Sequence, residues 1–119
     1  MQFGGRFNQS LESVILPRNL KVLELGADFN QSMVNVHLPS GLQTLIFGDD
    51  YNQSIASVTL PDSLRTLVFG CSFNRSMAGV KLPAQIQRVT FGRCFEHTTS
   101  LRRMILPIGG ARVESISFA

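Results

Sequence analysis

LQTLIFGDDYNQSIASVTLPDS, residues 42–63, decides the fold, because the chain repeats the pattern of this stretch on both sides of it. Its glycine, Gly48, has a counterpart at every 22nd residue in either direction. These counterparts are Gly4, Gly26, Gly70 and Gly92. A fixed period of about 20–50 residues is typical of solenoids, propellers and other repeat arrays. The sequence therefore predicts five consecutive copies of one structural unit.

Other residue columns keep the same phase. An aromatic residue stands three positions after each glycine, and an Asn follows it in the first four copies. The aromatic column is Phe7, Phe29, Tyr51, Phe73 and Phe95, and the polar column is Asn8, Asn30, Asn52, Asn74 and, in the fifth copy, Glu96. Leu-Pro recurs at 16–17, 38–39, 60–61, 82–83 and 106–107. One unit reads L-x-x-L-x-F-G-x-x-F-N-Q-S-Φ-x-x-V-x-L-P-x-x, where Φ is aliphatic.

Each unit contains two segments with the alternation of a short strand. These segments are L-x-F and V-x-L, each with one face expected to be buried. The proline ends pairing after V-x-L because it has no N–H, while the glycine suits a corner with positive φ or close backbone approach. A unit of 22 residues cannot bury its own apolar face, so successive coils must stack. We therefore predict an all-β solenoid, a leucine-rich-repeat-like right-handed stack of about five 22-residue coils with two short parallel strands each.

The Asn column allows two interpretations. All four of its Asn residues stand in Asn-x-Ser triplets, which fit the acceptor motif for N-glycosylation. A side-chain amide can also satisfy backbone groups at a corner and repeat that bond on the next coil. We favour this structural ladder, which comprises Asn8, Asn30, Asn52 and Asn74.

The unit resembles the FNIP repeat, a leucine-rich-repeat relative named for its Phe-Asn and Ile-Pro pairs. Phe7-Asn8, Phe29-Asn30 and Phe73-Asn74 carry the first pair, with Tyr51-Asn52 as a variant, whereas the second pair is Leu-Pro in every copy. BspA-like repeats have a similar layout. The resemblance implies a module that binds other proteins and lacks catalytic residues, but it supplies no binding residue at any position of this chain.

Length and composition favour one folded domain. The chain has 119 residues, 44% hydrophobic and 16% charged, which is unlike a disordered chain. We expect residues 1–119 to form a single repeat domain or a segment of a longer repeat chain. Residues 92–119 form an irregular terminal coil, interpreted as a cap or as a binding loop. The apolar ends of such a stack are expected to be covered by a partner or by further repeats.

Charge is divided along the chain. Residues 1–62 carry three basic and six acidic residues, a net charge of −3, and residues 63–119 carry eight basic and two acidic residues, a net charge of +6. The basic end contains Arg88, Arg93, Arg102, Arg103 and Arg112. This cluster predicts docking to an acidic protein surface or another anionic neighbour, or else it is a solvated face. Nucleic acid is disfavoured because no nucleic-acid-binding motif is present and the aromatic residues fall in core columns.

Residues that carry chemistry are sparse. The two histidines, His37 and His97, lie in different coils and columns, so we predict no catalytic site. Cys94 and His97 lack the paired spacing of a zinc site, and we predict no metal and no cofactor. Cys71 and Cys94 lie on adjacent coils, where a disulfide is conceivable, but reduced thiols are the default expectation.

The sequence thus predicts a non-catalytic module or scaffold for protein–protein interaction, docking through outward columns and the basic end. One alternative is a peripheral accessory subunit of a large complex, including an organellar, membrane-bound one. The other alternative is a secreted adhesin or glycan binder. We expect no transmembrane segment, and the N-terminus has no signal-peptide pattern, which favours an intracellular location, organelles included.

Overall fold

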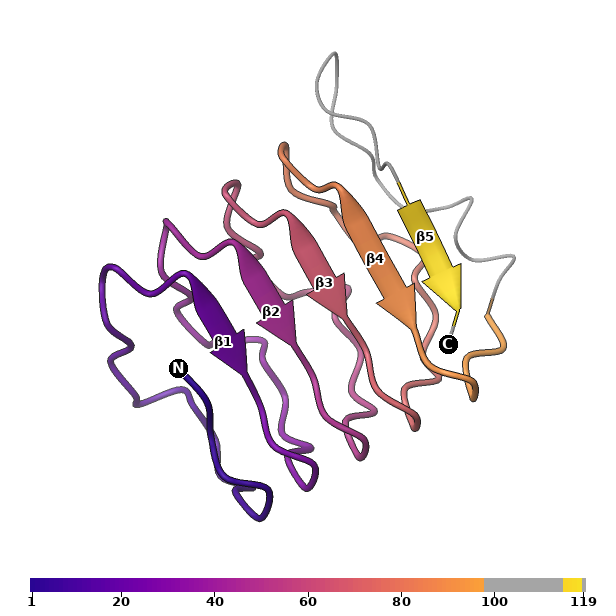
Figure 1. Ribbon diagram of the computed structural model, residues 1–119, viewed down its shortest axis with the longest axis horizontal. Coiled ribbons are helices and arrows are strands. Elements are labelled where there is room, and N and C mark those ends of the chain that lie inside the picture. Colours follow the sequence, from indigo (N-terminus) through magenta and orange to yellow (C-terminus); the bar gives the residue numbers. More distant parts are fainter. Residues whose placement is uncertain (98–114, 119) are drawn as a thin grey trace.

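The computed structural model describes residues 1–97 and, as backbone, the strand at 115–118. Its strands form one parallel sheet in chain order, β1 to β5 (Figure 1). They are β1 (Val22–Glu24), β2 (Thr44–Ile46), β3 (Thr66–Val68), β4 (Arg88–Phe91) and β5 (Ser115–Phe118). Leu23 of β1 pairs with Leu45 of β2, which pairs with Leu67 of β3, so strand register follows the 22-residue period. The predicted parallel solenoid is confirmed.

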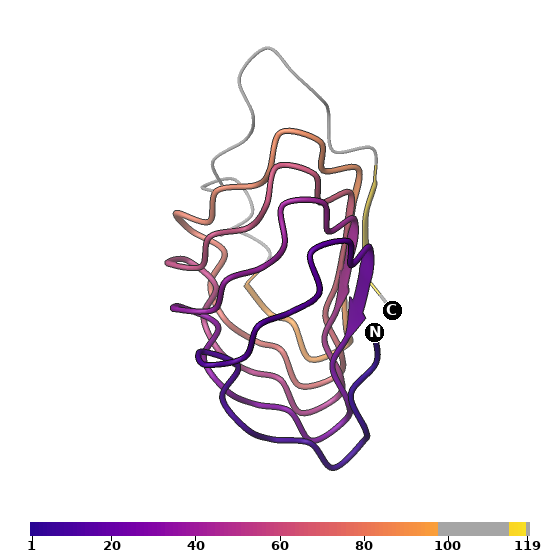
Figure 2. The same ribbon diagram turned by 90° about the vertical axis from the view of Figure 1, so that its left-hand side faces the viewer.

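The coils stack one behind another (Figure 2), and the buried core residues form continuous ladders through them. Leu23, Leu45 and Leu67 are fully buried behind the sheet. Beside them, ring centroids of the aromatic column repeat at 6.1 Å from Phe29 to Tyr51 and at 6.2 Å from Tyr51 to Phe73. Stacked aromatic pairs of this kind contribute about 0.5–1.5 kcal/mol each beyond the area they bury. Each coil therefore depends on its neighbours for its core.

The recurring glycine allows close approach between coils. A Cβ at Gly48 would lie 2.9 Å from the Cα of Ala27 and closer still to the carbonyl group of Gly26. Gly26, Gly70 and Gly92 meet the preceding coil in the same way. None of these glycines has positive φ, and in the described residues only Gly79 does. Of the two reasons for glycine that the sequence allowed, close backbone approach is therefore the one that applies.

The prediction that V-x-L forms a second strand in each coil is wrong. Within residues 1–97 these segments form no strand, and only Lys81 makes an isolated bridge. Hydrogen bonding explains the difference, because the Val N–H closes a turn inside its own coil, as in Val36 N–H to the Met33 carbonyl oxygen at 3.2 Å. The proline that follows V-x-L has no N–H to donate. Too few donors remain to pair one coil with the next.

Candidate functional site

The outer face of the sheet is an exposed, regular surface. Strand side chains alternate, so the central residue of each three-residue strand is buried and its neighbours point outward. We call this surface the outer sheet face; in the described strands its side chains are Val22, Glu24, Thr44, Ile46, Thr66, Val68, Arg88 and Thr90. The described residues place no further layer over it (Figure 2). Parallel sheets are normally covered on both faces, so this open face is suited to a partner.

Positive charge gathers where β3 and β4 begin, at one end of the outer sheet face. Arg88 is exposed at the start of β4, opposite Thr66 of β3. Arg65, also exposed, precedes Thr66, and its carbonyl oxygen accepts the Arg88 N–H at 3.0 Å. Sequence analysis missed Arg65, although residues 22 or 23 positions apart become neighbours in such a stack. The two guanidinium groups therefore emerge from adjacent coils.

The structure does not place the other predicted arginines beside Arg65 and Arg88. Arg93 is exposed but lies in the turn after β4, beyond the end of the strand opposite to Arg88. Arg102, Arg103 and Arg112 lie outside the described residues. Among the five predicted arginines, Arg88 alone is described on the outer sheet face.

The Asn column joins successive coils by hydrogen bonds. The Oδ1 atom of Asn30 accepts the backbone N–H of Asn52 at 2.8 Å, and Oδ1 of Asn52 accepts that of Asn74 at 2.9 Å. The same bond runs from Asn30 N–H to Asn8 and from Glu96 N–H to Asn74. These bonds satisfy backbone donors at a partly buried corner, which makes the column part of the framework.

Two further polar columns form hydrogen bonds that were not predicted from the sequence, one between coils and one within a coil. Gln53 Nε2 donates to the carbonyl oxygen of Asn30 at 3.2 Å and to its Oδ1 atom at 3.1 Å. The Ser column closes a tight turn, as where Ser54 Oγ accepts the N–H of Ala56 at 3.3 Å. The Asn-Gln-Ser run therefore supports the corners of the second and third coils, and in the fourth coil Arg75 replaces Gln, with its Nε donating to the Asn52 carbonyl oxygen at 3.0 Å.

The chemistry-bearing side chains do not form a reactive group. His37 is exposed on the side away from the sheet, whereas His97 is half-buried beside Phe95, with ring centroids 6.1 Å apart. Cys71 and Cys94 are free thiols. Within residues 1–97 and 115–118, no group of three His, Cys, Asp or Glu residues is placed to hold a metal ion, and no helix is long and apolar enough to cross a membrane.

One titratable group stands out in the core. The Tyr51 side chain is fully buried, and its hydroxyl has no hydrogen-bond partner. Burial in the aromatic ladder raises the pKa of Tyr51 above its usual value of 10.0. The hydroxyl faces no reactive group in the described chain, so we attach no chemical role to it.

Comparison with known proteins gives a consistent result. The FNIP Repeat model matches residues 7–50, 29–72 and 51–94, which together cover most of the chain. No curated protein matches significantly. Among solved structures, the crystal structure of CroV588, described as a novel circular LRR protein structure, superposes with a TM-score of 0.58 at 30% identity. The match covers 98% of this chain and 20% of CroV588, so this chain spans about a fifth of the length of that protein. From the family match and the repeat columns that the structure stacks, we conclude that the chain belongs to the FNIP repeat family.

Proposed function

We propose that this chain is a non-catalytic binding module that docks a partner protein on its outer sheet face. The observation that carries the proposal is the open face of a parallel sheet, which presents half-buried Ile46 and Val68 beside exposed Val22. Repeat modules with a leucine-rich-repeat-like fold are commonly used for protein interaction, which supports the same role. The stacked framework holds these side chains in place before binding, so docking loses little conformational entropy.

Charge suggests the character of the partner. Arg88 adds positive charge to a face that is otherwise mainly Val, Ile and Thr, with Glu24 at the β1 end, and the exposed Arg65 just before β3 adds a second positive charge beside it. An acidic patch on the partner placed over β3 and β4 would match this pattern. The predicted contribution of Arg93, Arg102, Arg103 and Arg112 to docking stays a prediction and is part of the same proposal.

The end of the first coil is suited to a second kind of contact. Phe3 and Phe7 stack there with centroids 4.5 Å apart and are half-buried, whereas their counterparts Phe47 and Tyr51 are buried. A partner or a further repeat would cover this apolar end, as the coils cover one another. CroV588, which is longer and circular, gives a precedent for continued stacking in a similar repeat protein.

A charge-reversal experiment tests the proposed docking face. The purified chain would be used as bait in an extract of its own cells, and recovered proteins would be quantified by mass spectrometry. Arg65→Glu combined with Arg88→Glu is expected to reduce recovery of specific partners at least tenfold. Arg6→Glu with Lys81→Glu is the matched control, because both residues are exposed, lie outside the outer sheet face and give the same change in net charge. Equal recovery by both double variants would contradict the proposal.

A further inference from the structure

The side of the stack away from the sheet carries an exposed apolar surface of its own. Five large hydrophobic side chains are exposed in residues 1–97, and three of them, Val14, Ile15 and Val34, lie at the V-x-L corners of the first two coils. The exposed fraction is 95% for Ile15, 38% for Val14 and 42% for Val34. Ile15 therefore adds almost nothing to the core, and its apolar surface is available to a partner.

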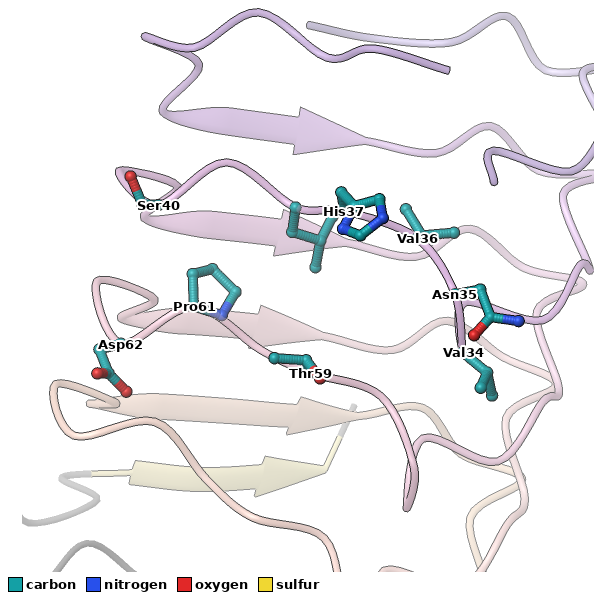
Figure 3. Close-up of a pocket in the computed structure, with 9 residues that line it drawn as sticks. Val34, Asn35, Val36, His37, Ser40, Thr59, Pro61 and Asp62 are labelled. Carbon is teal, nitrogen blue, oxygen red and sulfur yellow. The ribbon is translucent and has the colours of Figure 1, made fainter. Parts of the chain in front are cut away.

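Two hollows adjoin these side chains. The larger, of about 710 Å³, lies between the segment 34–40 of the second coil and the segment 59–62 of the third (Figure 3). The smaller, of about 370 Å³, lies between residues 12–18 of the first coil and the same second-coil segment. His37, Leu38 and Ser40 line both, so the second coil is their common wall. We call the two hollows together the corner groove.

The walls of the corner groove are neighbouring segments without mutual backbone pairing. In residues 1–62, no backbone hydrogen bond joins Ile15, His37 or Thr59 to an adjacent coil. Figure 3 shows the second- and third-coil segments running alongside each other. His37, Thr59 and Pro61 lie between Asp62 at one end of the larger hollow and Val34 at the other. Because these segments are not a sheet edge, an occupant would contact their exposed side chains and would not extend a sheet.

Charge favours a basic occupant. Asp62 is the one carboxylate lining the larger hollow, and no Lys or Arg lines it in the described chain. The smaller hollow is lined by Glu12 and Arg18, whose charges balance, so the groove as a whole carries one net negative charge, at Asp62. An incoming Lys or Arg therefore meets an attractive field and a carboxylate at the end of the larger hollow.

We propose that the corner groove binds an extended segment of a partner protein that carries alternating apolar side chains flanked by Lys or Arg. The apolar side chains contact Val14, Ile15 and Val34, and the flanking cation lies near Asp62. This surface is separate from the outer sheet face, so the chain has two docking surfaces on opposite sides of one stack.

A peptide array tests the corner groove directly. The probes are immobilised seven-residue peptides in which Val, Ile, Leu or Phe alternates with Ser or Thr, with Lys at both ends or Glu at both ends. The labelled full chain is expected to bind Lys-ended peptides at least fivefold more than Glu-ended ones. Ile15→Ser combined with Val34→Ser should reduce this binding at least fivefold, and Asp62→Asn should reduce the preference for Lys.

Two controls separate this proposal from docking on the sheet. Val22→Ser removes an equally exposed valine from the outer sheet face, and Arg65→Glu with Arg88→Glu reverses the charge there. Both should bind the array as the parent chain does. Binding of no peptide above background, equal binding of Lys- and Glu-ended peptides, or binding unchanged by the Ile15 and Val34 substitutions would overturn the corner-groove proposal and leave the sheet proposal intact.

Discussion

Replacing Gly48 by Ala should separate two coils that the structure holds in backbone contact. The added Cβ would stand 2.9 Å from the Cα of Ala27 and closer to the carbonyl group of Gly26. Neither neighbour is a flexible side chain, so relief requires the coils to move apart. An ordinary contact distance is restored by an opening of about 1 Å.

The size of the destabilisation follows from the hydrogen bond that this opening breaks. The N–H of Asp50 donates to the carbonyl oxygen of Ala27 at 2.9 Å, and a further 1 Å takes this bond beyond hydrogen-bonding range. Overpacking costs about 1–3 kcal/mol and the lost hydrogen bond costs about 1 kcal/mol more, which gives a destabilisation of about 2–4 kcal/mol. This is a large part of the 5–15 kcal/mol or so that stabilises a typical domain.

Urea unfolding followed by circular dichroism measures the effect, and the chain supplies matched controls. Gly4 belongs to the same column but has no atom within 4 Å of an added Cβ, so Gly4→Ala should change stability by less than about 0.5 kcal/mol. Gly79→Ala tests positive φ without crowding and should cost about 1 kcal/mol. If Gly48→Ala proves as mild as Gly4→Ala, the close approach between coils is refuted.

Three further outcomes are expected. Tyr51→Phe should raise the free energy of unfolding by about 1 kcal/mol in urea, because it removes a buried hydroxyl that lacks a partner; a loss of stability would contradict this. Because the pKa of Tyr51 is raised in the folded chain, the unfolded chain loses this proton first and stability should fall as pH rises past about 10; the Phe variant should lack that part of the fall, and an equal fall in both chains would refute it. Asn52→Ala should cost about 2 kcal/mol by leaving the Asn74 N–H without an acceptor, whereas Asn52→Asp, which keeps the acceptor, should cost less than half as much; equal losses would argue against the Oδ1 hydrogen bond.

The fold was predictable because one period governs many residues at once. The spacing of Gly26, Gly48 and Gly70 set the coil length, and the same spacing reappears as the register of Leu23, Leu45 and Leu67. The strand predicted at V-x-L was wrong, because an alternating pattern indicates which side chains are buried and does not indicate which acceptors the backbone N–H groups bond. The turn bond from the Val N–H is invisible in that pattern.

Surface clusters were harder to predict than core columns. The prediction grouped arginines that are close in sequence, such as Arg88, which begins β4, and Arg93, which lies beyond its other end. The neighbour that matters, Arg65, lies 23 residues away and belongs to the preceding coil. In a stack, proximity follows the repeat period, so charge patches must be sought across coils. Nothing in the sequence indicated that Ile15 belongs to a docking surface, since the residues at the equivalent position of the other coils vary.

Photo-crosslinking from Thr66 tests the central claim, that the outer sheet face binds a partner. Thr66 lies on this face between Thr44 and Arg88, and Ser72 in the same coil is exposed at a turn away from it. A photoreactive amino acid would be placed at either position in the full chain, which would then be irradiated in an extract of its own cells. We predict a discrete crosslinked protein from position 66 that is absent from position 72 and lost on adding Arg65→Glu and Arg88→Glu. Crosslinks of equal yield at both positions, or none at position 66, would contradict docking on the sheet.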